Sequence, residues 1–268
     1  MSCLGDGRER LGMSSFFRDS GRFFREVKIT RAIFGFSGTA KWLAAAVWNA
    51  PTIVKTKSLA AADRSLGSEL DVRCGDRTLS LTNADFGVCR EIFGHDCYRI
   101  TDLQGEIRTA IDLGCNFGTF TLMAATLNPG CRILAVDVNP EFTTATLGNA
   151  AANGFGESVT AWACIVGGAE VESVRVLQAR EPMAPFDPAA AIALLGGCDF
   201  LKCDVEGGEH LLFAGDLRWL RDVRRLAIEY HWTEADGERL AGILKAEGFE
   251  VECQPHRHLG YLFAVRRR

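Results

Sequence analysis

Acidic side chains that follow apolar runs are the residues of this chain best suited to chemistry. Asp112 lies in the run Ile-Asp-Leu, which leads into the turn Gly-Cys-Asn-Phe-Gly at 114–118 and then into an apolar segment from Thr119. This order is typical of a buried strand, a tight turn and a helix start, where bare backbone N–H groups face a ligand. Glycine at both ends of the turn permits positive φ and close backbone approach. A carboxylate just before the turn suits a cationic or hydroxyl-bearing ligand better than a pyrophosphate.

A second carboxylate ends the next apolar run. The segment Cys-Arg-Ile-Leu-Ala-Val-Asp predicts a buried strand that ends at Asp137, 23 residues after Gly114. At this position a carboxylate can hold the two hydroxyls of a ribose. The structural alternatives are a tight turn without a ligand and an Asp137 that merely precedes a helix. Together the two features predict a nucleoside site, with the candidate residues Asp112, Gly114, Asn116, Phe117, Gly118, Thr119, Asp137, Asn139 and Asp204.

Carboxylates and histidines also stand at the ends of two later apolar runs. Asp204 closes one run and His231 closes another, so both fall at the ends of predicted strands. A histidine titrates near the working pH, and a positioned base contributes about 10²–10⁴-fold to a rate. The sequence leaves open whether Asp204 is a base or a ligand of Mg²⁺ or Ca²⁺, and we expect no metal. The catalytic candidates are Asp204, Glu206 and His231, with His210 as a further base candidate.

Strands and helices alternate from Arg108 onward, which predicts a doubly wound parallel sheet. Two more strands, at 250–254 and 259–265, would form a terminal hairpin and complete a mostly parallel, seven-stranded, Rossmann-like α/β sheet. The carboxyl ends of parallel strands meet at one edge, so the acidic residues are expected to converge there. Strands are expected at 109–113, 132–138, 159–166, 199–205 and 225–231, and helices at 119–127, 140–153, 208–214 and 233–247.

The chain ahead of this sheet has a different pattern. Residues 1–68 predict an N-terminal helical cap, and the remaining domain, 69–268, begins with alternating residues in 69–82 that predict a β-hairpin. The stretch 167–196 contains three prolines and is expected to be a variable connection that contacts the substrate.

Three motifs resemble those of the FkbM-type methyltransferases. The run Lys-Cys-Asp-Val-Glu-Gly-Gly-Glu at 202–209 is similar to the family's Lys-x-Asp-Val-Glu-Gly-x-Glu signature, and the turn at 112–118 and the strand end at 228–231 are similar to its other hallmarks. The resemblance covers 70–265. It implies S-adenosylmethionine-dependent O-methylation of a small molecule or glycan, with a sugar hydroxyl favoured. In one departure, Asp137-Val-Asn-Pro stands where the family commonly has Glu followed directly by Pro.

The composition of the chain bears on which partners it binds and on the state of its cysteines. The 268 residues carry a net charge of −4, so no basic excess is available for phosphates and we expect no nucleic-acid partner. The ten cysteines form no C-x-x-C pair and no zinc spacing with the five histidines. Free thiols in a reducing cytoplasm are therefore expected.

The apolar stretch 33–50 is interrupted by polar residues and falls short of a membrane-spanning helix. We expect the N-terminal segment to be a cap that packs on the domain or on a partner subunit, rather than a peripheral membrane helix. The aromatic residues that would serve an interfacial helix are Phe16, Phe17, Phe23, Phe24, Trp42 and Trp48.

Three rival functions follow from the same residues. A nicotinamide oxidoreductase would need Gly-x-Gly-x-x-Gly, a pattern that Asn116 does not serve. A nucleic-acid or amino-group methyltransferase commonly has an Asn/Asp-Pro-Pro-aromatic run where Asp-Val-Glu-Gly stands at 204–207. The third rival is a catalytically degenerate domain that binds a nucleoside or a protein, and the intact carboxylates and glycines argue against it. The sequence leaves the acceptor and the oligomeric state open.

Overall fold

A seven-stranded sheet forms the centre of the structure. The computed structural model describes residues 8–167, 183–231, 234–255 and 259–267, and its strand order is β5-β4-β3-β6-β7-β9-β8. Neighbours from β5 to β7 pair in parallel, and β9 pairs antiparallel with both β7 and β8. The predicted doubly wound, mostly parallel sheet with a terminal hairpin is confirmed. The strands are β3 Thr109–Leu113, β4 Arg132–Asp137, β5 Val159–Ala163, β6 Phe200–Cys203, β7 Arg225–Tyr230, β8 Phe249–Pro255 and β9 Gly260–Arg266.

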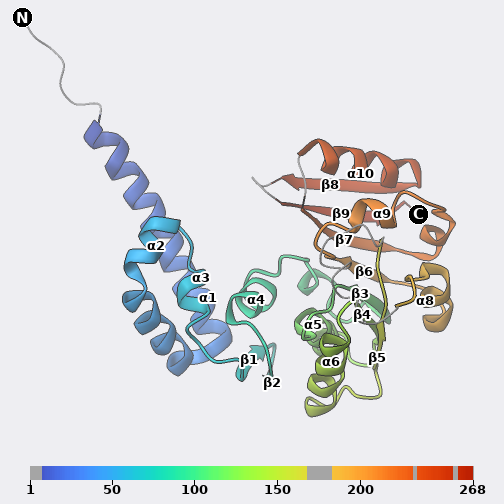
Figure 1. The fold of residues 1–268 in the computed structure, drawn as a ribbon, viewed down its shortest axis with the longest axis horizontal. Helices are drawn as coiled ribbons and strands as arrows, with labels where there is room; N and C mark the ends of the chain where they lie inside the picture. Colours follow the sequence, from blue (N-terminus) through green and yellow to red (C-terminus); the bar gives the residue numbers. More distant parts are fainter. Residues whose placement is uncertain (1–7, 168–182, 232–233, 256–258, 268) are drawn as a thin grey trace, which may run out of the picture.

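Helices cover both faces of this sheet (Figure 1). Side chains of β3 alternate between the two layers: Ala110 belongs to one apolar cluster, and Ile111 and Leu113 belong to the other. Both faces are therefore apolar, as expected for parallel strands that helices cover on each side. The helices of the domain are α5 Thr119–Leu127, α6 Pro140–Ala152, α8 Pro188–Leu195, α9 Glu209–Leu212 and α10 Glu234–Ala246, with a 3₁₀ turn at Arg218–Asp222.

The predicted hairpin is present and braces the glycine turn. Strands β1 Leu70–Cys74 and β2 Arg77–Leu81 pair antiparallel and form a sheet of their own. Asn149 of α6 accepts a hydrogen bond from the backbone N–H of Thr82 at 2.9 Å and donates one to the carbonyl oxygen of Phe117 at 2.9 Å. One buried amide side chain thus connects the end of the hairpin to the turn that begins the site.

The expected loop at 167–196 is wrong in its second half. Residues 168–182 lie outside the described part of the chain, but α8 Pro188–Leu195 is a helix that we did not predict. Asp187 caps it by accepting hydrogen bonds from the N–H groups of Ala189 and Ala190, and Gly196 ends it in the left-handed conformation. These signals stand in the sequence. The three prolines suggested a loop, but Pro188 stands at the first helical position, where proline favours a helix start.

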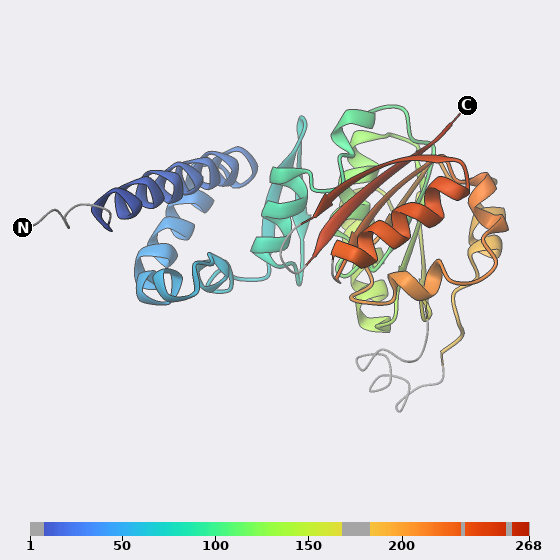
Figure 2. The same cartoon turned by 90° about the horizontal axis from the view of Figure 1, so that it is seen from above.

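The described part of the N-terminal helical unit, residues 8–68, projects from one side of the sheet domain (Figure 2). Its helices are α1 Arg8–Trp48, kinked at Gly35 where φ is 66°, α2 Ala50–Thr56 and α3 Ala60–Asp63. The short helix α4 Phe86–Cys89 and the π-helical turn Arg90–Gly94 connect this unit to the sheet domain, and a 3₁₀ turn at Thr101–Leu103 leads to β3.

A buried polar cluster holds the unit in place. The indole N–H of Trp42 donates to Asp63 at 2.7 Å, and the guanidinium of Arg90 pairs with Asp63 at 2.8 Å and with Glu26. Trp42 is fully buried, which corrects its place among the interfacial aromatic residues. The side chains of Phe16 and Phe17, also named for that role, lie outside the described part of the chain.

Two further expectations concern the whole chain. In the described part of the chain, no helix is long and apolar enough to cross a membrane. The nine described cysteines are free thiols, and most of them are buried among apolar side chains.

Candidate functional site

A cavity of about 710 Å³ lies at the carboxyl ends of β3, β4, β6 and β7, which we call the carboxyl edge of the sheet. Its volume is typical of small-molecule sites, and its position is the one at which open α/β sheets bind ligands. Six of the nine residues expected at the cofactor and all three expected catalytic residues line it. They are Gly114, Asn116, Thr119, Asp137, Asn139, Asp204, Glu206 and His231.

Asp137 occupies the place expected for a ribose carboxylate. Its side chain is 8% exposed, and its two oxygens accept hydrogen bonds from the backbone N–H groups of Asn116 at 3.0 Å and of Asn139 at 2.9 Å. Burial raises the pKa of Asp137 above its ordinary value, although these two hydrogen bonds oppose the shift. The glycine turn and the start of α6 thus fix this carboxylate at the cavity wall, and its remaining lone pairs can accept from a ligand.

The glycine turn packs closely against the strand beside it. Gly114 has φ of 75°, and a Cβ added there would lie 1.7 Å from the backbone oxygen of Asp204. Only glycine fits, because both the conformation and the contact exclude a side chain. The sequence pattern predicted close backbone approach to a ligand, and the structure shows that the approach at Gly114 is to the end of β6.

Three expected cofactor residues do not line the cavity. The side chain of Asp112 is fully buried, accepts a hydrogen bond from the Thr121 hydroxyl at 2.6 Å and pairs with the ammonium of Lys202 at 3.2 Å. Phe117 packs its ring against Phe142, with centroids 4.7 Å apart, and Gly118 begins α5 in the left-handed conformation. These residues shape the turn, and their contact with a cofactor stays a prediction.

Lys202 is the cation beneath this acidic edge. It is 2% exposed, and its ammonium donates to the carbonyl oxygens of Leu113 at 3.1 Å and Gly114 at 2.7 Å. It also lies 3.8 Å from a carboxylate oxygen of Asp204. Burial alone would lower the pKa of Lys202, but Asp112 and Asp204 outweigh burial and raise it. The lysine therefore stays charged, ties the glycine turn to β6 and partly neutralises the carboxylates.

Tyr98 bridges two carboxylates at the cavity wall. Its hydroxyl is 2.9 Å from Asp204 Oδ2 and 3.0 Å from Glu229 Oε2. A phenol has one proton to donate, so the second contact is a hydrogen bond only when that carboxyl carries a proton. Burial, together with the charge of Asp204, raises the pKa of Glu229 to about 7. Glu229 is therefore the carboxyl that holds a proton near neutral pH.

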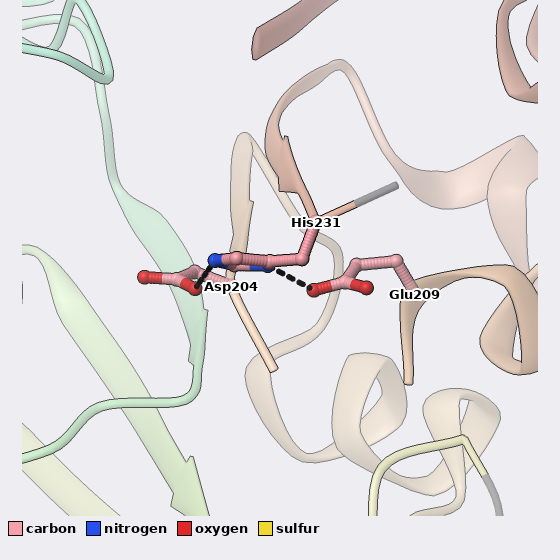
Figure 3. Close-up of side chains that lie close together, drawn as sticks. All are labelled: Asp204, Glu209 and His231. Carbon is pink, nitrogen blue, oxygen red and sulfur yellow. Dashed lines mark hydrogen bonds and ion pairs between the residues drawn. The ribbon is translucent and has the colours of Figure 1, made fainter. Parts of the chain in front are cut away.

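His231 lies among carboxylates, as Figure 3 shows for two of them. Its Nδ1 is 3.2 Å from Glu209 Oε1, while its Nε2 lies 3.6–3.8 Å from oxygens of Asp204, Glu206 and Glu229. The hydrogen bond to Glu209 outweighs burial and, with the other carboxylates, raises the pKa of His231 to about 9. The imidazole is accordingly protonated at neutral pH.

Asp204, Glu209 and His231 each offer one atom within 4.8 Å of the others, a spacing at which a metal ion can be held. Glu209, however, is 1% exposed and accepts from the backbone N–H groups of Val205 and Gly207 as well as from His231. These contacts make Glu209 a brace for the imidazole and for the start of α9. The expectation that no metal takes part stays a prediction.

Sequence reasoning left several contributors out of the expected site. The expected site residues include none of Lys202, Tyr98 and Glu229, although Lys202 belongs to the motif at 202–209. His210, a base candidate, lines a separate small cavity with Glu209 instead. The charged lysine in an otherwise apolar strand was a usable signal, because a buried lysine needs a carboxylate partner. Tyr98 lies over 100 residues from its partners, and no local pattern links them.

Comparison with known proteins finds distant similarities only. No family model matches the chain, and no curated protein matches it. Among solved structures, the METTL16 methyltransferase domain is 17% identical with a TM-score of 0.44, and the match covers 64% of this chain and 65% of that domain, less than two thirds of its length.

Two bacterial structures are similar to a comparable degree. TrmK of M. capricolum, solved with S-adenosylhomocysteine, is 11% identical with a TM-score of 0.42, over 65% of this chain and 68% of that one. Precorrin-6y C5,15-methyltransferase of Geobacter metallireducens is 13% identical with a TM-score of 0.42, over 65% of this chain and 89% of that one. With identities below 25% and TM-scores below 0.5, these likenesses support no inference about this chain.

Proposed function

We propose that this chain is an S-adenosylmethionine-dependent O-methyltransferase of the FkbM type that acts on a hydroxyl of a small molecule or glycan. The observation that carries the proposal is one cavity holding both a ribose carboxylate, Asp137, and a carboxylate suited to accept a proton, Asp204. The three FkbM-like motifs meet at this cavity, although they lie far apart along the chain.

The lining residues fit a nucleoside that carries a positive charge. Asp137 suits the ribose hydroxyls, and the carboxylates of Asp204 and Glu206 suit a sulfonium. Within the described residues, Asn116 Oδ1 and Asp204 Oδ1 are buried and accept no hydrogen bond. Both belong to lining residues, so a ligand with hydrogen-bond donors would satisfy them.

Methyl transfer to a hydroxyl demands positioning and the removal of one proton. S-adenosylmethionine, when bound, supplies a methyl group on sulfur. Asp204 Oδ1 is the atom that we assign to take the acceptor's proton, because Tyr98 already donates to Oδ2. Positioning can supply about 7–11 kcal/mol of the barrier, and the base about 10²–10⁴-fold.

His231 has a different role in this proposal from the base that the sequence suggested. With a pKa of about 9 it already carries a proton at neutral pH, so it cannot accept one there. The imidazolium instead lies between Asp204 and Glu206 and moderates their repulsion, while Glu209 fixes its orientation. Glu206, with 82% of its side chain exposed, is placed to contact the acceptor at the mouth.

The experiment that tests the proposal is calorimetric titration with S-adenosylmethionine and S-adenosylhomocysteine, with NAD as the control. Binding of both sulfur nucleosides and not of NAD would support the cofactor assignment. Transfer of a labelled methyl group to a set of methyl glycosides then tests the acceptor class. Binding without transfer to any hydroxyl compound would favour a catalytically degenerate domain, and binding of NAD alone would overturn the proposal.

A further inference from the structure

The N-terminal helical unit carries a charge opposite to that of the rest of the chain. Residues 1–68 contain eleven basic and five acidic residues, whereas residues 69–268 contain nineteen basic and twenty-nine acidic residues. The net charge of −4 therefore hides a unit of +6 joined to a domain of −10. The expectation that no nucleic acid binds was based on the total charge, and it stays a prediction.

The basic side chains of the unit that the structure describes are exposed, and they form no ion pair with other described residues. Its two acidic residues with described side chains, Glu26 and Asp63, are both engaged by Arg90 of the neighbouring turn. Within the described part of the chain, none of the exposed cations of the unit forms an ion pair. These are Arg22, Arg25, Lys28, Arg31, Lys41, Lys55, Lys57 and Arg64.

The unit also carries an exposed apolar stripe. After the kink at Gly35, one face of α1 is buried, whereas the opposite face is exposed although its residues are mostly apolar. Residues spaced by three or four positions share one face of a helix. The stripe consists of Phe36, 77% exposed, Ala40, Ala44, Val47, 77% exposed, and Trp48, 88% exposed; Val54 of α2, 77% exposed, follows it.

A helix that packs on a protein with one face normally presents polar residues on the other. This segment of α1 is apolar on both faces, so its outer face needs another partner. The excess of cations in the unit favours an anionic partner, and Lys41 lies within the exposed face itself. Figure 1 and Figure 2 show the unit standing away from the sheet domain, so an extended surface can reach it.

We propose that the N-terminal helical unit docks the protein on the surface of an anionic lipid bilayer. Phe36, Val47 and Trp48 would enter the boundary between headgroups and acyl chains, and the lysines and arginines would contact anionic headgroups. Aliphatic side chains such as Val47 and Val54 neither pair with phosphates nor stack on bases, which disfavours RNA. The proposal is independent of methyl transfer and of the cofactor.

The test is flotation of the full chain with vesicles of phosphatidylcholine alone and of phosphatidylcholine mixed with phosphatidylglycerol. We expect binding to the anionic vesicles only, weakening with added salt. Charge reversal by Lys41→Glu, Lys55→Glu and Lys57→Glu should weaken binding about a hundredfold, since each lysine contributes about 1 kcal/mol. The double variant Phe36→Ser, Trp48→Ser should weaken it at least about tenfold.

Matched control variants distinguish docking through the helical unit from nonspecific hydrophobic binding. Leu147→Ser with Leu194→Ser removes two half-exposed leucines from α6 and α8 of the sheet domain and should leave vesicle binding unchanged. Circular dichroism and the melting temperature check that each variant folds. Equal binding to both vesicle types, or no binding to either, would overturn the proposal. A gel shift with tRNA in a protein that does not bind vesicles would also overturn the proposal. A dimer in light scattering that the variant Phe36→Ser, Trp48→Ser dissociates would do the same.

Discussion

The carboxyl edge of the sheet and the N-terminal helical unit differ in whether their charged side chains are buried and paired or exposed and unpaired. At the carboxyl edge, Lys202, Asp112 and Glu229 are buried and each contacts an opposite charge or a hydrogen-bond donor. In the helical unit the cations are exposed and unpaired within the described part of the chain. The two acids with described side chains, Glu26 and Asp63, pair with Arg90. Buried charges need fixed partners because their desolvation is costly, whereas exposed charges remain in water and need none.

The two regions differ in whether their function depends on the position of single atoms or on the overall charge. Function at the carboxyl edge depends on individual atoms within about 3 Å of each other, so a single substitution should have a large effect. The surface of the helical unit depends on a sum of similar charges, so single substitutions there should have small effects. The predictions below test this difference.

The largest effect is expected on catalysis at Asp204. Asp204→Asn keeps the size of the side chain and removes the group that takes the proton, so we expect kcat to fall about 10²–10⁴-fold. The affinity for S-adenosylhomocysteine, measured by calorimetry, should change little. A variant with full turnover would remove Asp204 from the role of base.

Lys202→Met should destabilise the fold strongly. The substitution leaves Asp112 as an unpaired, fully buried carboxylate, and breaking a buried ion pair in this way costs about 3–5 kcal/mol. Urea denaturation measures the change, and the double variant Lys202→Met, Asp112→Asn should recover part of the loss. A loss below 1 kcal/mol would mean that the pair behaves like a surface ion pair.

Asp137→Ala tests the cofactor side of the carboxyl edge. Loss of hydrogen bonds to a carboxylate typically costs about 1.5–3 kcal/mol, so we expect the Kd for S-adenosylhomocysteine to rise about 10–150-fold. Thr144→Ala, on the exposed side of α6, is the matched control and should leave this Kd unchanged. Unchanged affinity in Asp137→Ala would exclude the ribose contact.

Glu229 should make stability depend on pH. Its folded-state pKa of about 7 lies above the ordinary value of 4.5, so the folded protein holds a proton that the unfolded chain releases. This contribution is fully present below about pH 4.5 and is lost as the pH rises through 7. The groups that face Glu229 are the same in the native chain and in the variant Glu229→Gln. They are Asp204, Glu91, Tyr98 and His231.

We therefore expect the unfolding free energy of the native chain to fall between these pH values more steeply than that of Glu229→Gln. Urea denaturation at a series of pH values provides the comparison. Parallel curves for the two proteins would show that Glu229 is already ionised in the folded state.

The smallest effect is expected in the helical unit. Lys41→Gln should change the unfolding free energy by less than about 0.5 kcal/mol, because an exposed, unpaired charge adds little to stability. Asp63→Asn, which weakens the buried contact to Arg90, should cost more, about 1–3 kcal/mol. Equal effects of the two substitutions would contradict the contrast between exposed and buried charges.

Much of the fold could be read from local patterns. The clearest cases are strands β3 and β4, helix α5 and the terminal hairpin. Each follows an apolar run, because the regular geometry of a strand or helix sets the spacing of the residues that it buries. Helix α8 was missed, although Asp187 and Gly196 signalled its ends, because three nearby prolines suggested a loop. Residues at strand ends converge as topology demands, so Asp137, Asp204 and His231 were found at the cavity.

The sequence by itself determined the order of elements, the carboxylates at the strand ends and the glycines of the turn, because these depend on residues that are neighbours in the chain. Only the tertiary structure decided what each group contacts. It paired Asp112 with Lys202, set Tyr98 between Asp204 and Glu229, and buried Trp42 while leaving Trp48 exposed. Burial and charge depend on residues far apart in sequence, and these surroundings make His231 a cation where the sequence suggested a base.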